Sequence, residues 1–329
     1  MSAKPRIALV ATGGTIDSVG VDRLDLAWYW ENQQRLGPGQ LLARVPELAN
    51  IATVEEAPFR RFSSGAMTPA DWLDMARLID ELLGDYDGAV VTHGTNTLEE
   101  TAYFLHLTLN SDKPVIVTGA MRPSTGLSSD GDLNLLNAVR VAADPLASGK
   151  GVLVVLNDTV HAARDVTKTN TYRVHTFQSP DAGPLGYADS DGTLVWLRAP
   201  VRRHGGFDGA ASLSHLPRVD IVVSYPGADG ALIDAAVGAG AQGLVSAGAG
   251  AGRPTPLEDE ALDRACQRGV VVVQASRTGS GRVARTPNLR SRGIVAAGDL
   301  RPWKARVLLM LALTVSRDPE QIQQMFDEY

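Results

Sequence analysis

The sequence predicts an α/β protein with a larger, Rossmann-like N-terminal domain built on a parallel sheet and a smaller C-terminal α/β domain. Short β-branched apolar runs alternate with helix-like segments along most of the chain, which is typical of parallel α/β architecture. Residues 198–217 interrupt this pattern with an aperiodic stretch that contains Arg, Gly and Ser. Since 329 residues suffice for two domains of ordinary size, we expect domains at 1–197 and 218–329, joined by a linker at 198–217.

Four strands are expected in the N-terminal domain. All are short, apolar and followed by polar or glycine-rich residues, and they lie at residues 7–11, 88–92, 114–118 and 152–156. Runs that are apolar on both faces are typical of a buried parallel sheet. Because ligands bind beyond the carboxyl ends of such strands, we expect the polar residues after all four strands to converge on one site.

Three helices are expected between these strands. The first begins after Thr68, because Thr is a good N-cap and Pro69 suits the first helical turn. The other two cover residues 98–109 and 132–143.

The C-terminal domain repeats the alternation of strands and helices. Its strands are expected at residues 221–225, 243–247 and 270–275. The sequence of residues 301–315 predicts an amphipathic helix, and a short helix is expected to begin at Asp318.

Composition and charge exclude several classes of protein. Hydrophobic residues make up 44% and charged residues 21%, which is the balance of a globular protein. The net charge of −6 disfavours a nucleic-acid partner, and no apolar run approaches the ~18 residues of a membrane helix. The N-terminus shows no secretory leader, and the single Cys266 with no zinc-like Cys/His spacing predicts a cytoplasmic, metal-free protein.

Hydroxyl groups follow the first strand, in Thr12-Gly13-Gly14-Thr15. Two glycines allow a tight turn that brings backbone N–H groups close to a ligand. One Thr is then a candidate nucleophile and the loop a candidate oxyanion site. The alternative is a phosphate-binding turn, or simply a tight strand-to-helix connection.

A similar turn follows the second strand, with His93 and Thr95 ahead of Glu99 and Glu100. His93 is a candidate base, but a structural His bonded to the backbone is the favoured interpretation. The two Glu residues suit the positive end of the following helix. Lys168, flanked by Thr residues further along the chain, is either a solvated cation or a desolvated one that activates a hydroxyl.

Four ordered motifs together resemble the bacterial L-asparaginase family. They are Ala11-Thr12-Gly13-Gly14-Thr15-Ile16, His93-Gly94-Thr95-Asn96-Thr97, Gly119-Ala120-Met121-Arg122-Pro123-Ser124 and Asp165-Val166-Thr167-Lys168-Thr169-Asn170. The resemblance extends through Gly183-Pro184-Leu185-Gly186 to Gln321-Ile322-Gln323-Gln324. It implies a large N-terminal and a small C-terminal domain, and a homotetramer whose active sites lie between paired subunits.

The resemblance also assigns roles to residues. Thr15 matches the family's nucleophile, and Thr95 with Lys168 matches the second hydroxyl and the cation that polarises it. Ser64 matches the residue that holds the substrate's α-carboxylate. Tyr29 is the single Tyr in residues 17–34, the segment that matches the family's mobile flap, and it takes the role of the flap's catalytic Tyr.

The residues that would hold the substrate's α-ammonium depart from the family pattern. Gly65 and Asn96 stand where the family has Gln and Asp, and Arg253 and Thr286 stand where a partner subunit supplies Asn and Glu. One interpretation is compensation by a carboxylate among Asp130, Asp132 and Glu99. The other is a substrate that carries no free α-amino group, or a bulky group in its place.

The implied activity is hydrolysis of a small carboxamide, L-asparagine or a close relative, to a carboxylate and ammonia, with no cofactor. An amidase of the same mechanism for a blocked or bulky carboxamide is one alternative. A catalytically silent amide-binding relative is disfavoured because Thr15, Thr95 and Lys168 are all present. The ammonia-releasing subunit of a tRNA-dependent amidotransferase is disfavoured by the acidic charge balance. The expected partner is the small-molecule amide.

Overall fold

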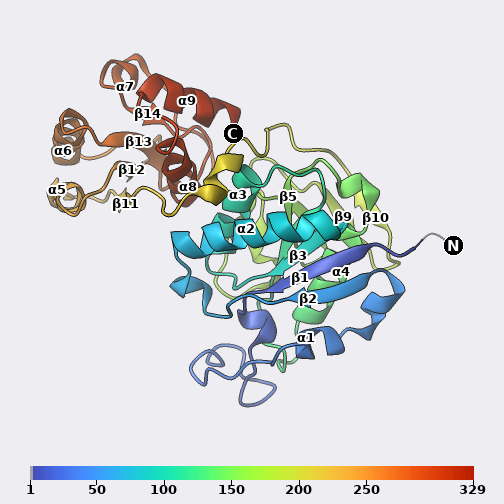
Figure 1. Cartoon of the computed structure of the whole chain (residues 1–329). Coiled ribbons are helices and arrows are strands. Elements are labelled where there is room, and N and C mark those ends of the chain that lie inside the picture. The colour runs from blue at the N-terminus through green and yellow to red at the C-terminus, as the bar shows by residue number, and fades with distance from the viewer. Residues whose placement is uncertain (1–2) are drawn as a thin grey trace. The chain divides into compact units, whose positions relative to one another are not determined.

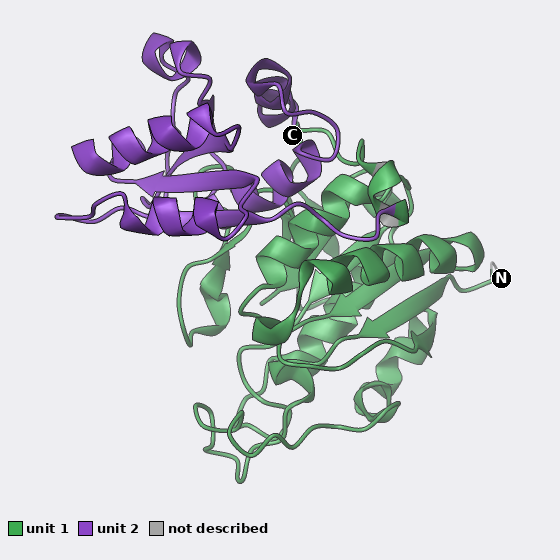
Figure 2. Cartoon of the chain, turned by 60° about the vertical axis from the view of Figure 1, so that its left-hand side comes forward, with its two compact units in different colours: residues 1–212 green, residues 213–329 purple. Residues whose placement is uncertain are grey.

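The computed structural model describes residues 3–329, in which strands and helices alternate along the chain (Figure 1). The chain forms two compact units, unit 1 (Met1–Ser212) and unit 2 (Leu213–Tyr329), which are coloured separately in Figure 2. The division falls inside the segment 198–217. Most of that segment nevertheless packs on unit 1, because Phe207 is buried and its backbone N–H donates to the carbonyl of Leu107 at 3.1 Å.

Unit 1 is built on an eight-stranded sheet in the order β10-β9-β6-β5-β4-β3-β1-β2. The strands from β2 to β5 pair in parallel, and the remaining pairs are antiparallel. The four predicted strands are confirmed to within a residue: β1 (Arg6–Ala11), β3 (Gly88–Thr92), β4 (Val115–Thr118) and β5 (Val152–Leu156). Four others were missed: β2 (Thr53–Ala57), β6 (Thr159–Ala162), β9 (Gly186–Ala188) and β10 (Leu194–Trp196).

The helices of unit 1 cover this sheet (Figure 1). The larger ones, which confirm the three predicted, are α2 (Pro69–Asp85), α3 (Leu98–Thr108) and α4 (Gly131–Ala142), and α1 (Gln40–Ala43) is short. Alternate residues of β1, Ile7 and Leu9, share one hydrophobic core with Leu135 and Val139 of α4. The central strands are buried on both faces, so the loops beyond their carboxyl ends are attached to well-packed strands.

Unit 2 has a four-stranded parallel sheet in the order β11-β12-β13-β14. The strands are β11 (Val219–Val223), β12 (Gly243–Gly248), β13 (Val271–Ser276) and β14 (Val295–Ala296). The helices are α5 (Ala231–Gly238), α6 (Pro256–Gln267), α7 (Pro287–Ser291), α8 (Pro302–Ala312) and α9 (Pro319–Glu328). The first predicted strand is displaced by two residues, and β14 was missed.

The prediction of an amphipathic helix at 301–315 was wrong in its pattern and its length. Helix α8 ends at Ala312, and every residue from Val307 to Leu313 is buried. It packs against β11, β12 and β13 on one side and against α9 on another. A helix that packs against other elements on more than one side lacks the exposed polar face of an amphipathic helix.

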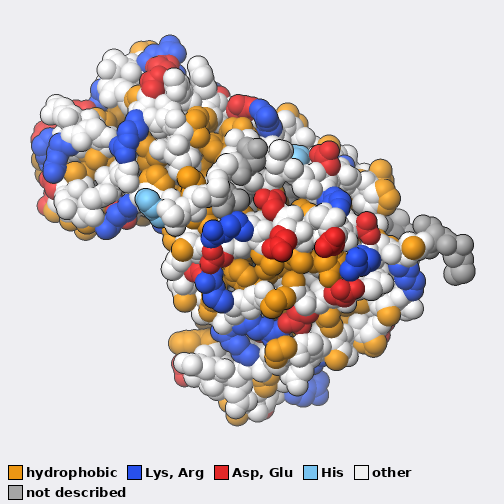
Figure 3. All heavy atoms as spheres, viewed as in Figure 1, with side chains coloured by type: hydrophobic (Ala, Val, Ile, Leu, Met, Phe, Trp, Pro, Cys, Tyr) orange, Lys and Arg blue, Asp and Glu red, His pale blue; other side chains and the backbone are white. Residues whose placement is uncertain are grey.

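Figure 3 shows one face of the chain, on which Lys and Arg side chains lie among Asp and Glu side chains. No continuous basic area is visible on that face. Among residues 3–329, no helix has both the length and the apolar character needed to cross a membrane.

Candidate active site

The loops that follow β1 and β3 contact each other through glycine. The two strands are parallel neighbours, with Ala11 opposite Thr92. A Cβ atom on Gly14, which has a φ of 107°, would lie 2.4 Å from the Cα of Gly94. Glycine is therefore required where these loops meet. This contact places Thr15 and Thr95, each the residue after a glycine, on adjacent loops at one end of the sheet.

A pocket of about 840 Å³ opens at this end of the sheet. Its walls come from the flap (residues 17–34), the strand ends, the segment before α2 and the loop after Lys168. Six of the nine predicted site residues line it: Thr15, Tyr29, Ser64, Thr95, Asn96 and Lys168. The strand ends therefore converge as expected in three cases, since Met121 after β4 also lines the pocket.

The fourth strand end does not reach the pocket. Residues Asn157 and Asp158, with φ values of 48° and 60°, form the tight turn that joins β5 to β6. The Asn157 N–H donates to Asn134 at 2.8 Å, and Asp158 accepts from Asn137 at 2.9 Å. These two bonds fasten the turn to α4, and neither Asn157 nor Asp158 lines the pocket.

Tyr29 brings the flap to the first candidate hydroxyl. Its Oη lies 2.8 Å from Oγ1 of Thr15, a hydrogen-bonding distance. Burial raises the pKa of Tyr29 above its usual value, while the bond to Thr15 opposes that rise. Tyr29 is therefore a neutral phenol at physiological pH. Such a phenol can accept a proton from Thr15 while it donates its own phenolic proton to another group.

The two ends of the flap are joined at its base. The N–H of Val19 donates to the carbonyl of Gln34 at 2.9 Å, and the N–H of Leu36 donates to the carbonyl of Asp17 at 2.7 Å. Between these bonds, Ser18 and Arg35 form an antiparallel bridge. The flap is thus a loop with a closed neck, and the neck residues Ser18 and Arg35 both line the pocket.

Lys168 holds the second candidate hydroxyl. It lies on β7 (Thr167–Lys168), which pairs with β8 (Phe177–Gln178). Its Nζ donates to Oγ1 of Thr95 at 2.9 Å and to Oδ1 of Asn96 at 3.4 Å. Burial lowers the pKa of Lys168, and the nearby carboxylate of Glu99 opposes that change. Lys168 is thus the desolvated cation beside a hydroxyl, not the solvated one.

Glu99 has a role that the sequence analysis missed. Its Oε1 accepts a hydrogen bond from the backbone N–H of Lys168 at 2.9 Å. This role could not be inferred from the position of Glu99, because a Glu in the first turn of a helix is already explained by the helix dipole. The bond fastens β7 to α3 and so fixes Lys168 beside Thr95.

Ser64 lies in η3 (Ser64–Ala66), a short 3₁₀ helix before α2, and is buried. A Cβ on Gly94 would lie 2.7 Å from its Oγ, so the glycine gives this hydroxyl its place in the pocket wall. Thr97 donates to the carbonyl of Ser64 at 2.9 Å. Ser64 is therefore held against the same loop that carries Thr95.

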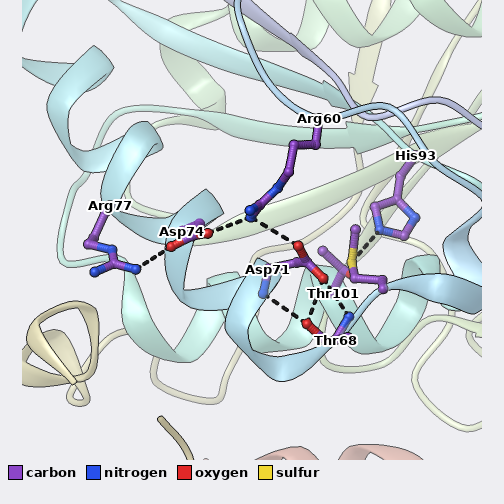
Figure 4. Close-up of polar contacts among 8 residues, drawn as sticks. Arg60, Thr68, Asp71, Asp74, Arg77, His93 and Thr101 are labelled. Atoms are coloured by element: carbon purple, nitrogen blue, oxygen red, sulfur yellow. Dashed lines mark hydrogen bonds and ion pairs between the residues drawn. The ribbon is translucent and has the colours of Figure 1, made fainter. Parts of the chain in front are cut away.

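The segment after Ser64 leads into a capped helix (Figure 4). Thr68 accepts from the Asp71 N–H at 3.3 Å, and Asp71 accepts from the Thr68 N–H at 2.8 Å, which is a capping box. Arg60 joins Asp71 at 2.9 Å and also contacts Asp74, which pairs with Arg77. These contacts anchor both ends of the segment that carries Ser64.

His93 is structural. It is completely buried, its Nδ1 lies 2.8 Å from the carbonyl oxygen of Gly94, and its Nε2 lies 3.2 Å from the sulfur of Met67. Thr101 contacts the same sulfur (Figure 4). Burial lowers the pKa of His93 to about 4, so the ring is neutral and stays outside the proton chemistry of the pocket.

The remaining predicted site residues lie outside this pocket. Gly65 is exposed beside it, and a Cβ there would meet only Oγ of Ser63, at 3.9 Å. Arg253 and Thr286 belong to unit 2. The backbone of Arg253 forms a bridge with Ala249, and Thr286 caps α7 by accepting from the Leu289 N–H at 3.3 Å.

None of the three acidic residues considered as compensation lines the pocket. Asp130 accepts from the backbone N–H groups of Met121 and Arg122, at 2.9 Å in the closest contact with each. Asp132 pairs with Arg44 at 2.7 Å. Glu99 bonds to the backbone of Lys168. Each carboxylate therefore has a structural contact, and compensation from these positions is not seen in unit 1.

A charged cluster beside the pocket was also missed. Arg35 and Arg61 line the pocket, and Asp17 is buried behind them. The Asp17 carboxylate accepts no hydrogen bond from a described residue, and Nη1 of Arg61 lies 3.9 Å from it. Burial raises the pKa of Asp17 to about 6, although Arg35 and Arg61 oppose the rise.

The fold and the pocket place the chain among asparaginase-type amidohydrolases, enzymes that hydrolyse C–N bonds of linear amides. The family description "Asparaginase, N-terminal" matches residues 6–202, and "Glutaminase/Asparaginase C-terminal domain" matches residues 218–326. The chain belongs to the asparaginase family.

Named relatives agree with this assignment. The chain is 45% identical to "L-asparaginase 2" of Escherichia coli, covering 99% of this chain and 94% of the relative. It is 40% identical to "Glutaminase-asparaginase" of Pseudomonas fluorescens, covering 98% and 90%. The crystal structure of a "Probable Cytoplasmic L-asparaginase from Campylobacter jejuni" superposes with a TM-score of 0.92 at 40% identity, covering 99% of this chain and 100% of the other.

Proposed function

We propose that this enzyme hydrolyses the side-chain amide of L-asparagine or a close relative, with Thr15 as the nucleophile. The observation that carries the proposal is the 2.8 Å contact between Thr15 Oγ1 and Tyr29 Oη in the pocket that also holds Thr95 and Lys168. A nucleophile beside a proton acceptor, with a second activated hydroxyl nearby, is what two-step amide hydrolysis requires.

In the first step, Thr15 Oγ1 attacks the amide carbon and its proton passes to Tyr29. Tyr29 passes its own proton to the departing nitrogen as the C–N bond breaks, so ammonia leaves and an acyl ester remains on Thr15. Backbone N–H groups near Thr95 stabilise the oxyanion, a contribution that is often the largest in such reactions. Flap closure excludes bulk water during this step.

In the second step, water hydrolyses the ester. Thr95 accepts a proton from the attacking water while its own proton passes to Lys168 in the neutral form. As the C–O bond to Thr15 breaks, the hydroxyl of the tetrahedral intermediate gives its proton through Tyr29 to Thr15 Oγ1, so a carboxylate leaves and the Thr15 hydroxyl is restored. The lowered pKa of Lys168 suits this role, because the neutral amine is more accessible than in a solvated lysine.

The test is the variant Thr15→Val, which keeps the side-chain shape and removes the hydroxyl. We expect ammonia release from L-asparagine or a related carboxamide to fall by at least 100-fold with normal thermal unfolding. Thr12→Val is the matched control, because Thr12 is buried on the same loop and bonds to the Thr92 carbonyl at 2.9 Å outside the pocket. Activity of Thr15→Val above a tenth of wild type would show that another group is the nucleophile.

A second candidate function is hydrolysis of a carboxamide that lacks a free α-ammonium or carries a bulky group there. It is supported by the pocket lining, which in the described part of the chain includes three cations and no carboxylate. The exposed position of Gly65 leaves room for such a group. A hydrogen bond to a charged group contributes ~1.5–3 kcal/mol, or roughly one to two powers of ten in affinity.

The double variant Gly65→Gln with Asn96→Asp tests this second candidate. Asparagine turnover should rise and turnover of its deaminated analogue should fall, by about 10-fold each. Wild-type saturation by asparagine at micromolar concentration would instead favour L-asparagine as the substrate.

We further propose that the enzyme is a cytoplasmic homotetramer with active sites shared between paired subunits. The name of the similar Campylobacter jejuni structure supports the location, although a relative from Haemophilus influenzae is named periplasmic. In such an assembly Arg253 and Thr286 of one subunit would face the pocket of another.

A further inference from the structure

Arg35 is a cation in the pocket wall whose side chain is unpaired among residues 3–329. Its guanidinium makes no hydrogen bond or ion pair with any described residue, although Asp17 lies close enough to interact with it electrostatically. Arg61, the neighbouring cation, is differently placed. It pairs with Glu56, and it donates to the carbonyl of Leu36 at 2.9 Å. Arg35 is therefore the pocket arginine with donors left for a ligand.

The backbone makes room for this guanidinium. A Cβ on Gly13, which has a φ of 98°, would lie 2.5 Å from Nη1 of Arg35 and 2.9 Å from the carbonyl oxygen of Phe62. The guanidinium thus lies where the loop before Thr15 meets the segment before Ser64. Gly13 is two residues from the candidate nucleophile, and Phe62 is two residues from the residue assigned to a carboxylate.

The electrostatics of the pocket favour an anion at this position. The described residues that line it supply Arg35, Arg61 and Lys168 and no carboxylate. Glu56 is paired with Arg61, and Glu99 lies beside Lys168. Asp17 is buried behind the two arginines. A ligand carboxylate would form a charge-assisted pair with Arg35, the strongest kind of hydrogen bond that arginine makes.

We propose that Arg35 is a specificity-determining residue that binds a carboxylate of the substrate, and that the preferred substrate is an anionic carboxamide rather than a zwitterionic one. This inference rests on the proposed amide hydrolysis. Because Arg35 also forms the neck of the flap with Ser18, a carboxylate bound there ties substrate recognition to the base of the flap that carries Tyr29.

The experiment compares Arg35→Gln with wild type on two matched amides, succinamate, which has one carboxylate, and succinamide, in which an amide replaces it. We expect the KM for succinamate to rise about 10- to 100-fold with kcat changed less than threefold, and the KM for succinamide to stay unchanged. Arg35→Lys should recover part of the loss. Arg23→Gln is the control, since it removes the same charge from an exposed flap position outside the pocket lining.

A binding measurement separates this inference from the proposed function. Succinate, a dicarboxylate with no scissile amide, should raise the thermal unfolding temperature of wild type and Arg23→Gln, and this shift should be lost in Arg35→Gln. An unchanged succinate shift, or equal losses on succinamate and succinamide, would overturn the role of Arg35. If wild type hydrolyses no carboxamide, the proposed function fails, and the succinate shift still decides whether Arg35 binds the anion.

Discussion

Asp17 lies two residues after Thr15, with its carboxyl group buried beside Arg61. Burial raises its pKa from 3.8 to about 6. Between these pH values the folded protein holds a proton that the unfolded chain has released. The stability contributed by this group is therefore fully present below pH 3.8 and is lost as pH rises to 6.

The variant Asp17→Asn should not lose stability as the pH rises from 3.8 to 6, because its side chain carries no ionisable group. A shift of about two pKa units corresponds to about 3 kcal/mol at most, so the variant should be more stable than wild type at pH 8 and nearly equal to it at pH 4. Denaturant unfolding at the two pH values measures the difference. If the variant were less stable than wild type at pH 8, attraction between Asp17 and the two arginines would outweigh the burial penalty.

At the scale of single residues, the sequence predicted the pocket residues that belong to recognisable motifs. Thr15, Tyr29, Thr95 and Lys168 all line one pocket. Asp17, Arg35 and Glu99 were missed because their roles depend on long-range packing. Glu99 meets a strand 69 positions later, and the guanidinium of Arg35 is placed by Gly13 and not by any local pattern.

Helix α2 shows how a local signal becomes a stable element. Thr68 and Asp71 form its capping box directly after the segment that carries Ser64. Thr68→Ala should lower the free energy of unfolding by about 1 kcal/mol, because the first turn of the helix loses the side-chain acceptor for one of its N–H groups. Thr68→Ser keeps that acceptor and should behave as wild type in denaturant unfolding. A change below about 0.3 kcal/mol for Thr68→Ala would show that solvent replaces the cap.

Among the elements, central strands were predicted well and edge strands poorly. β3, β4 and β5 are fully buried, so their sequences are continuous apolar runs. β2 lies at the edge of the sheet and one of its faces is open to solvent, so its sequence, Thr-Val-Glu-Glu-Ala, contains polar residues. β9 and β10 have only three residues each, which is too short for a recognisable pattern. Helix α8 was misjudged for the opposite reason, since nine of its eleven residues are buried and the helix lacks the polar face of an amphipathic one.

At the scale of the whole molecule, the proposed homotetramer predicts a particle of four times 34.9 kDa in solution. Light scattering at assay concentration measures this mass directly. If active sites are shared between subunits, dilution that dissociates the tetramer should lower the specific activity along with the measured particle mass. An active monomer would contradict the shared site and leave Arg253 and Thr286 without a role in substrate binding.

In the proposed reaction, an acyl group is transferred to Thr15 before water completes the hydrolysis. The variant Lys168→Met should slow the second step more than the first, because it removes the group proposed to accept the Thr95 proton, and general-base losses are typically 10²- to 10⁴-fold. Acid quenching of this variant during turnover of a carboxamide, followed by peptide mass mapping, shows where the acyl group lies. We predict an added acyl mass on the peptide that contains Thr15. An adduct on the peptide that contains Thr95, with none at Thr15, would contradict the account.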